Sequence, residues 1–435
     1  MRLEPIRVTR VILSHLLLLA TLFPSAACSE DDPPSGEVRQ QGHIKVVWLR
    51  GTPYEMGLQH AELLHDELVA GRAFVDDDFM FSTMLGYADN LGLDVTAAEH
   101  SYESTLEECR GLADGMDGVW TLEECLVLNY GDVVVEILKM DGLGCSQFVA
   151  NGSATTDGEL IHGRNLDWWE VEFIEQNPVI FVREPAAGIP WVSVGFPANM
   201  SPYTGMNLMG IAVASNEISA PLETELKREG RSHVQMVREI LRSTTSFEEA
   251  EAFLRAQDHA PAETLVVSDG PGGKAAAFEM TAYSFQVRTL SGDGLVYATN
   301  HFVHPDMEAT QEPEPEGTSS WNRFERLRQL LEPGEAESLY GSLDVPGAIS
   351  ILRDSYNPST QEWVDPFLID GGDTLANNGA MQSVVFVPAR GLMYVAVGEF
   401  PVTVLQFVGF SVDDLTGQPN ATPPNPASYP ALSAP

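Results

Sequence analysis

Apolar residues recur at helical spacing in several long blocks of this 435-residue chain. This period predicts helices over 53–79, 97–113, 121–139, 231–256, 319–332 and 346–354. Thr121 to Glu124 and Ser246 to Glu249 have the capping-box pattern that starts a helix.

Between these blocks, short β-branched and aromatic runs are separated by turn residues. They predict strands over 145–150, 159–164, 178–184, 191–195, 209–215, 264–268, 274–281, 284–289, 295–299, 383–388 and 392–398. Runs of strands with helices in separate blocks favour an α+β fold over βαβ alternation.

The N-terminus has the pattern of an export signal. Arg2, Arg7 and Arg10 precede an apolar run over 11–22, and small residues follow up to Ala27. This predicts a signal peptide over 1–27, too short for a comfortable membrane span. Cys28 directly after the small residues resembles a bacterial lipobox, which implies lipidation of its thiol; simple secretion is the alternative. We expect the cell envelope as location, with a membrane contact only through such an anchor.

The regions flanking the predicted domain have their own composition. An acidic, Pro-containing tether is predicted over 28–44, a single domain over 45–415, and a disordered Pro/Ser/Ala tail over 416–435. The chain is strongly acidic, with 24 Lys and Arg against 63 Asp and Glu. Phosphate binding needs basic residues, so this balance argues against nucleic acid as a partner. We expect neither metal nor cofactor, and see no glycine-rich phosphate loop.

Three of the four cysteines can be explained by a role other than catalysis. Cys28 is the lipidation candidate, and Cys109 and Cys125 lie in two helical segments, where they either form a disulfide or stay as buried thiols. Cys145 is then the odd cysteine, and an unpaired thiol in an exported protein is notable.

Cys145 follows Gly144 at the start of a predicted strand, and Arg164 and Asp167 return on the next one. A hairpin would bring the thiol, the guanidinium and the carboxylate together. A nucleophile that becomes the first residue of a chain can use its own α-amine as base. That chemistry requires cleavage between Gly144 and Cys145, with Arg164 steadying the thiolate and Asp167 holding the amine.

These residues resemble the cysteine-type N-terminal nucleophile (Ntn) hydrolases, a group that includes penicillin V acylase, bile salt hydrolase and acid ceramidase. The layout is most similar to the isopenicillin-N acyltransferase family. The resemblance rests on motifs in family order over about 45–400: 51–57, Cys145, 163–167, 205–216, 298–302, 319–324 and 382–386.

The resemblance implies a four-layer αββα fold of two antiparallel sheets between helical layers. It implies self-cleavage into an α fragment (45–144) and a β fragment (145–415) that stay together. Cys145 would then attack a linear N-acyl amide through a thioester, giving hydrolysis or acyl transfer.

The resemblance also implies roles for more distant residues. Asn300 would donate to the oxyanion, with Asn216 as a second donor, and Arg323 would complete the site. Trp168 and Trp169 are core residues by default, although aromatics beside a nucleophile could line an acyl pocket.

Two other functions remain open at this point. A papain-like protease would use Cys145 with His301 or His304 and Asn357, but papain-like sites place the cysteine at a helix start. A lipid-anchored solute-binding protein would need two lobes of parallel sheet.

Overall fold

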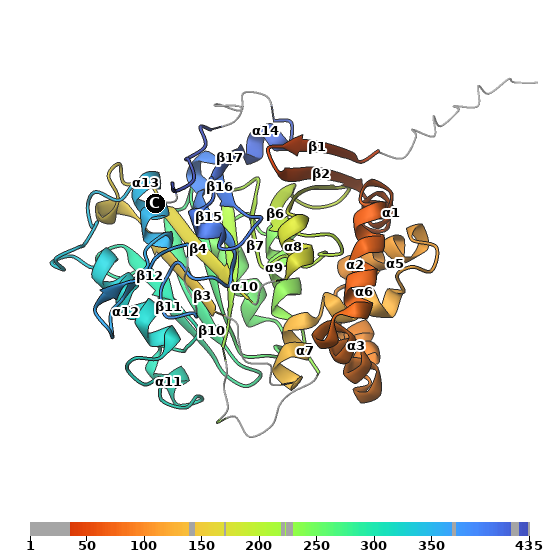
Figure 1. Cartoon of the computed structure of the whole chain (residues 1–435), viewed down its shortest axis with the longest axis horizontal. Coiled ribbons are helices and arrows are strands. Elements are labelled where there is room, and N and C mark those ends of the chain that lie inside the picture. The colour runs from red at the N-terminus through yellow and green to blue at the C-terminus, as the bar shows by residue number, and fades with distance from the viewer. Residues whose placement is uncertain are drawn as a thin grey trace, which may run out of the picture. The chain divides into compact units, whose positions relative to one another are not determined.

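Two β-sheets lie face to face between helices in this computed structural model (Figure 1). The structure describes residues 35–138, 144–168, 171–218, 222, 229–367, 371–418 and 426–433. The predicted signal peptide, Cys28 and Trp169 lie outside the described residues, so their predicted roles stay predictions.

The larger sheet has nine strands in the order β1-β2-β5-β6-β7-β8-β9-β10-β11. They are β1 (Glu37–Gln41), β2 (Ile44–Gly51), β5 (Val179–Pro185), β6 (Trp191–Gly195), β7 (Thr204–Asn207), β8 (Ile211–Glu217), β9 (Glu263–Asp269), β10 (Lys274–Met280) and β11 (Phe285–Thr289). β2 and β5 pair in parallel. The other strand pairs of this sheet are antiparallel, as expected, and the one parallel pair is possible because a long crossover connects β2 and β5.

The smaller sheet has six strands in the order β12-β3-β4-β15-β16-β17, all antiparallel. They are β12 (Leu295–Ala298), β3 (Gly144–Ala150), β4 (Ile161–Asp167), β15 (Ala380–Val387), β16 (Leu392–Ala396) and β17 (Val408–Ser411). A separate hairpin joins β13 (Tyr356–Asn357) and β14 (Glu362–Trp363).

Apolar side chains fill three spaces between the layers. Between the sheets, residues such as Ile180 and Val192 pack with Phe386 and Met393. Helices cover the outer faces, near both ends of Figure 1. They are α1 (Pro53–Leu63), α2 (His65–Asp77), α3 (Phe79–Leu91), α4 (Leu93–His100), α5 (Glu103–Gly115), α6 (Leu122–Leu128), α7 (Gly131–Leu138), α8 (Glu172–Gln176), α9 (His233–Ser243), α10 (Phe247–Arg255), α11 (Pro305–Glu308), α12 (Ser319–Leu331), α13 (Val345–Leu352) and α14 (Val412–Leu415). The expected αββα layering is confirmed.

Several predicted helices are divided in the structure. The helix expected over 53–79 breaks at Leu64 into α1 and α2, and α3 then starts at an Asp78 cap that the pattern did not reveal. Both predicted N-caps are present: Thr121 has the full capping box, and Ser246 accepts the Glu249 N–H.

The described parts of both flanking regions are more ordered than their composition predicts. Part of the expected tether forms β1, which pairs with β2, so the folded domain begins before residue 45. In the expected disordered tail, Tyr429 exchanges main-chain hydrogen bonds with Phe407, and its ring packs against Tyr394. Main-chain pairing and one aromatic contact thus order a stretch of low overall hydrophobicity.

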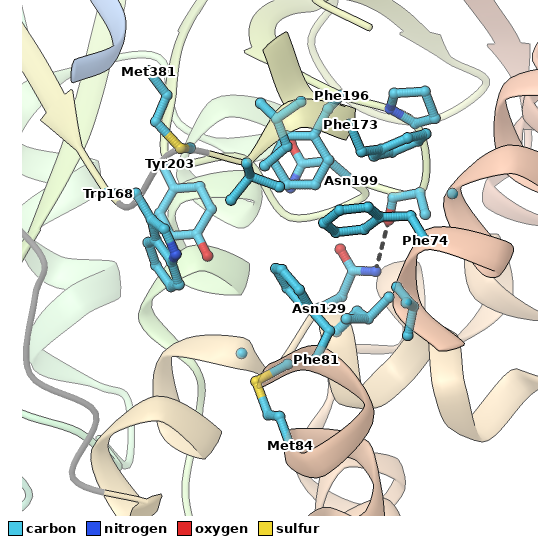
Figure 2. Close-up of a pocket in the computed structure, with 18 of the residues that line it drawn as sticks. Phe74, Phe81, Met84, Asn129, Trp168, Phe173, Phe196, Asn199, Tyr203 and Met381 are labelled. Atoms are coloured by element: carbon cyan, nitrogen blue, oxygen red, sulfur yellow. Dashed lines mark hydrogen bonds between the residues drawn. The ribbon is translucent and has the colours of Figure 1, made fainter. Parts of the chain in front are cut away.

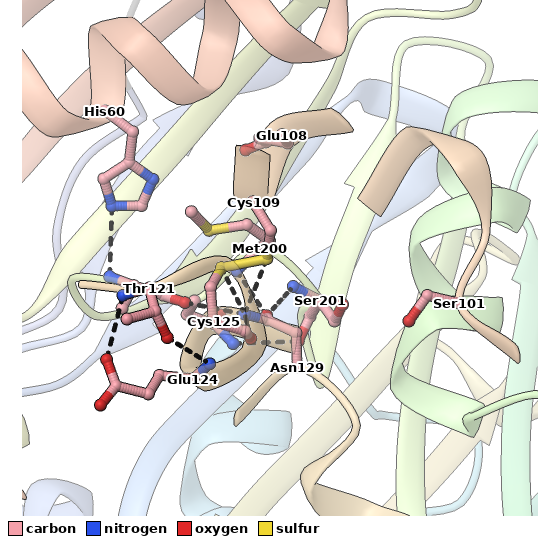
Figure 3. The surroundings of a disulfide bond; sticks show 12 residues. His60, Ser101, Glu108, Cys109, Thr121, Glu124, Cys125, Asn129, Met200 and Ser201 are labelled. Carbon is pink, nitrogen blue, oxygen red and sulfur yellow. Dashed lines mark hydrogen bonds between the residues drawn. A yellow bond between two sulfur atoms is a disulfide. The ribbon is translucent and has the colours of Figure 1, made fainter. Parts of the chain in front are cut away.

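Cys109 of α5 and Cys125 of α6 form a disulfide across a separation of 16 residues (Figure 3). Asn129 lies beside both sulfur atoms, and its Oδ1 accepts the main-chain N–H groups of Met200 and Ser201 at 2.8 and 2.9 Å. The bonded helices are thereby joined to the loop after β6.

Candidate active site

The site is built on the predicted hairpin between β3 and β4. Cys145 lies opposite Leu166, and Gly144 lies opposite Asp167. Antiparallel register therefore puts the thiol next to residues that are about twenty positions away in sequence. A Cβ on Gly144 would lie 3.0 Å from Asp167 Oδ2 and 3.2 Å from Asp167 Cβ, so the close approach of the carboxylate favours glycine.

The Cys145 thiol is buried, with 2% of its residue surface exposed. Arg164 Nη2 lies 3.7 Å from Sγ, and the main-chain N–H of Asp167 also donates to the sulfur. Burial nevertheless raises the pKa of the thiol to about 11, against the opposing effect of Arg164. In the uncut chain the nucleophile is therefore a thiol that needs a base.

Arg164 is fully buried and held in place by β8. Nη1 and Nη2 donate to the Ser215 carbonyl at 3.1 and 2.8 Å. Burial lowers the pKa of Arg164, while Cys145 and Asp167 oppose that change. The guanidinium is thus a fixed positive charge beside the sulfur.

Asn300 and Arg323 contact the main chain of the nucleophile. Asn300 Oδ1 accepts the Cys145 N–H at 2.6 Å, and Arg323 Nη1 donates to the Cys145 carbonyl at 2.5 Å. Arg323 Nη2 also donates to Asn300 Oδ1 at 2.9 Å, and Ser320 Oγ accepts the Asn300 N–H. Residues from two distant segments therefore converge on the main chain on either side of the Cys145 side chain.

Asp167 faces the same junction from β4. Its Oδ2 accepts from Asn377 Nδ2 at 2.7 Å, whereas its buried Oδ1 has no hydrogen-bond partner among the described residues. Burial raises the pKa of this carboxyl to about 6, although Arg323 and Asn377 oppose the shift. Asn377 was missed in the sequence because Asn-Asn-Gly looks like an ordinary turn.

Asn216 is bonded to Gln147, a neighbour of the nucleophile on β3. Its two Nδ2 protons donate to the carbonyls of Ala298 and Thr299, and its Oδ1 accepts from Gln147 at 2.6 Å. The amide is thereby committed to connecting the sheets, so this geometry does not support the expected second oxyanion donor. Gln147 itself, bonded also to His162 at 3.2 Å, was not singled out in the sequence.

An apolar pocket lies beside the nucleophile (Figure 2). Phe74, Phe81 and Met84 come from the helical region before Gly144, and Trp168 and Tyr203 lie opposite them. Its other walls are formed by residues that include Phe173, Phe196 and Met381. Trp168 thus lines this pocket, and its role as a wall for the substrate stays a prediction.

Trp168 and Tyr203 also line a second, smaller cavity that contains Cys145. Asp132, Glu217 and Glu263 form part of its wall. The sequence offered no signal for this acidic wall, because the three residues lie on separate elements in a chain that is rich in carboxylates.

Neither a metal centre nor a spanning helix is found in the described part of the chain. No group of three or more His, Cys, Asp or Glu side chains there could hold a metal ion. Likewise, no described helix is long and apolar enough to cross a membrane.

A sequence profile identifies the family. The acyl-coenzyme A:6-aminopenicillanic acid acyl-transferase family matches residues 153–400, more than half of the chain. The chain belongs to this family. The matched region contains Arg164, Asp167, Asn300 and Arg323 and begins just after the nucleophile hairpin strand β3.

Other similarities are more distant. An uncharacterized protein of Archaeoglobus fulgidus is 26% identical over 365 residues, which cover 73% of this chain and 59% of that protein. The chain thus matches less than two thirds of its relative's length.

Solved structures of similar arrangement include a Caenorhabditis elegans ortholog of N-acylethanolamine-hydrolyzing acid amidase, with TM-score 0.40, 18% identity, and coverage of 56% of this chain and 93% of that one. Penicillin V acylase from Agrobacterium tumefaciens has TM-score 0.36 and 16% identity, with 58% and 83% covered. A variant of conjugated bile acid hydrolase from Clostridium perfringens has TM-score 0.41 and 15% identity, with 66% and 98% covered.

The geometry disfavours both alternative functions. Cys145 lies on a strand, and the His301 Nδ1 atom is bonded to Ser320 Oγ at 2.7 Å instead of facing the thiol. Asn357 Oδ1 accepts from the turn N–H of Ser359. The stacked sheets also differ from the two parallel lobes of a solute-binding protein.

Proposed function

We propose that this protein is a self-cleaving Ntn amidohydrolase that acts on linear N-acyl amides through Cys145. The observation that carries the proposal is the convergence of Arg164, Asp167, Asn300 and Arg323 on the Gly144–Cys145 junction. Membership of an acyl-transferase family supports acyl chemistry.

Self-cleavage begins with attack of Cys145 Sγ on the Gly144 carbonyl carbon. The peptide C–N bond breaks, the Cys145 nitrogen takes a proton, and Gly144 becomes a thioester on the sulfur. Water then hydrolyses the thioester, leaving a Gly144 carboxylate and a free α-amine on Cys145. Asn300 Oδ1, which already accepts the Cys145 N–H, supports the nitrogen through this change.

In the mature enzyme the α-amine takes the proton of the thiol, and the sulfur attacks the amide carbonyl of the substrate. The amide C–N bond breaks as the leaving nitrogen is protonated, and water hydrolyses the acyl thioester. The unused proton acceptor Asp167 Oδ1 holds the ammonium form of the α-amine, and Arg164 stabilises the thiolate. The second Asn300 Nδ2 proton serves the oxyanion, since the first donates to Glu217 O.

The lining of the pocket beside Cys145 supports a substrate with an apolar acyl group. The pocket of Figure 2 is walled by aromatic and Met side chains and adjoins the nucleophile through Trp168 and Tyr203. We favour water over an amine as acyl acceptor, because acyl-CoA is scarce outside the cytoplasm and an export signal is predicted. Lipidation at Cys28 and location in the cell envelope remain part of this proposal.

Expression of wild-type protein and Cys145→Ala tests the proposal. The wild type should give two fragments on a denaturing gel, with Cys145 as a new N-terminal residue, and should hydrolyse N-acyl amides with long acyl chains. Cys145→Ala should remain one chain without activity. A single uncut wild-type chain, or turnover that equals the Cys145→Ala background, would overturn the proposal.

A further inference from the structure

The apolar pocket has a near end and a far end relative to the nucleophile. At the near end, Trp168 and Tyr203 pack in one cluster with the Cys145 side chain. At the far end, Phe74 and Val75 of α2 pack in the core of the helical layer. Figure 2 shows Trp168 and Tyr203 on one side of the pocket and Phe74 on the other. An acyl group that is attached at Cys145 and fills the pocket therefore extends toward α2.

Helix α8 brings an aromatic ring to this far end. Ile174 of α8 packs in the cluster with Cys145, whereas the preceding Phe173 stacks on Phe74, with ring centroids 5.9 Å apart and planes inclined by 21°. Both rings line the pocket, on the side away from Trp168 (Figure 2). The far end is thus formed by an aromatic pair from two separate helices.

Gly71 of α2 provides the space for the Phe173 ring. A Cβ on Gly71 would lie 2.6 Å from Phe173 Cζ and 3.1 Å from Cε1 and Cε2, so the tip of the ring occupies the place of a side chain. Glycine inside a helix is less favourable than alanine, because it loses more conformational freedom on folding. The close approach of the ring explains a glycine in the middle of α2.

The position of Phe173 contributes little to the core. Helix α8, which is described over its full length, has no fully buried residue, and Phe173 itself is partly buried. Its ring nevertheless lines the pocket and contacts the helix on the far side. Substitution of Phe173 should therefore change the pocket more than it changes folding.

We infer that Phe173, which packs on Gly71 and stacks on Phe74, is the end wall of the acyl pocket and sets the longest acyl chain that fits. This inference rests on the proposed amide hydrolysis at Cys145. Each methylene that enters the pocket adds favourable burial until the chain reaches the ring. A longer chain has to displace a packed aromatic pair, which overfills the site. The substrate class is then amides of linear acyl groups with a defined upper length.

A series of fluorogenic N-acyl amides of aminomethylcoumarin, with saturated chains of eight to eighteen carbons, tests the inference. Wild-type kcat/KM should rise by up to about fourfold per added methylene and then fall beyond one chain length. Phe173→Ala should move the maximum by about two carbons or more, since a phenyl ring has the apolar surface of several methylenes. For chains just beyond the wild-type maximum, it should raise kcat/KM relative to shorter chains by about tenfold or more.

Two further variants serve as comparisons. Phe173→Leu keeps part of the wall and should shift the maximum in the same direction by a smaller step. Glu172→Ala, at the exposed preceding position on α8, is the matched control and should leave the chain-length profile unchanged. Because each profile is measured within one preparation, partial misfolding lowers all its rates by the same factor.

Fatty-acid binding to Cys145→Ala gives a second measurement that does not depend on turnover. In isothermal titration calorimetry, affinity should increase with chain length and reach a plateau where the chain meets Phe173. The plateau should lie at longer chains when Phe173→Ala is added.

The outcomes separate the inference from the proposed function. A profile or a plateau that is unchanged in Phe173→Ala would overturn the inference and leave the amidase proposal intact. An equal shift in Glu172→Ala would also overturn it, because the effect would then come from α8 as a whole. Absence of turnover above Cys145→Ala for every chain length would instead remove the proposed function, while the binding plateau would still decide whether Phe173 ends the pocket.

Discussion

At the scale of single residues, the site depends on buried charge that its environment only partly compensates. Arg164 has its protons directed to a carbonyl and a thiol, and Asp167 keeps one oxygen without a hydrogen-bond partner among the described residues. Such groups lower stability and are retained where they serve chemistry. Asp167 provides the clearest test.

Asp167→Asn in a Cys145→Ala background should change the pH dependence of stability. Burial raises the pKa of Asp167 to about 6, above its ordinary value of 3.8. A raised pKa in the folded state gives stability that is fully present below pH 4 and lost as the pH rises through 6. Relative to Asn, Asp should therefore lose roughly 2 kcal/mol of unfolding free energy between pH 4 and pH 7, out of about 3 kcal/mol for the complete titration.

Urea unfolding of the two uncut proteins at several pH values measures this difference. If the gap between Asp and Asn stays constant from pH 4 to pH 7, Asp167 has no raised pKa. The uncut background is needed because cleavage would create an ammonium group on residue 145. That positive charge would favour the ionised form of Asp167.

At the scale of elements, the sequence predicted the nucleophile hairpin well. Alternating β-branched and aromatic residues with turns between them mark β3 and β4, so the approach of Arg164 and Asp167 to Cys145 could be anticipated. The local sequence pattern does not show which strands pair with each other. β15 pairs with β4 from more than 200 positions away, and this pairing brings Asn377 to Asp167. β1 was missed because a polar, exposed edge strand has no apolar alternation.

Helix α3 should contribute to acyl recognition through one face only. Phe81 lines the apolar pocket, whereas Phe79 on the same helix is 84% exposed. Phe81→Ser should lower kcat/KM for a twelve-carbon acyl chain by on the order of tenfold or more, because apolar contact with the chain is lost. Short acyl substrates should be much less affected.

Phe79→Ser is the matched control, since it makes the same substitution two positions away without changing the pocket. Steady-state kinetics over a series of acyl lengths gives the comparison. Equal effects of the two substitutions on the chain-length profile would show that α3 does not contact the acyl group.

A second element-scale prediction concerns the contact of α5 with the larger sheet. Glu108 bonds Arg183 of β5 at 3.0 Å and Arg238 of α9 at 2.5 Å, with all three side chains buried. Burial alone would raise the Glu108 pKa, but the two guanidinium groups lower it. Glu108→Gln should cost about 3–5 kcal/mol, because two buried cations lose their counter-charge.

Glu107→Gln on the same helix removes only a partly exposed pair with Arg110 and should cost less than about 1 kcal/mol. Chemical denaturation of both variants in the Cys145→Ala background compares them in one chain. Similar losses would mean that the buried network adds no more than a surface ion pair.

At the scale of the whole molecule, the proposed cleavage would cut a chain whose two parts are already interleaved. β1 and β2 precede Gly144, yet they belong to the same sheet as β5 to β11. The Glu108 network crosses the same boundary, while the disulfide lies entirely before it. Sheet pairing and buried charge, not a covalent link, would therefore hold the fragments together.

Burial of neutral histidine side chains makes the stability of the molecule sensitive to acid. Burial lowers the pKa of His60 and His162 to about 3 and that of His301 to about 4. A base with a lowered pKa in the folded state gives stability that is present above its unfolded pKa of 6.5 and lost as the pH falls toward the folded value. Each such histidine adds a slope of about 1.4 kcal/mol per pH unit below pH 6.

Melting temperatures of uncut protein between pH 7.5 and pH 4.5 should therefore fall steadily, against the opposite contribution of Asp167. His60→Gln should make the fall in stability with decreasing pH shallower, because about one proton fewer is taken up on unfolding. This holds whatever the effect of the substitution on stability at pH 7.5. His65→Gln, at an exposed position one turn further along, should leave the slope as it is. Parallel curves for the wild type and His60→Gln would show that His60 is not held neutral. Acid loss of stability would then have to arise from the carboxylates that this chain carries in excess.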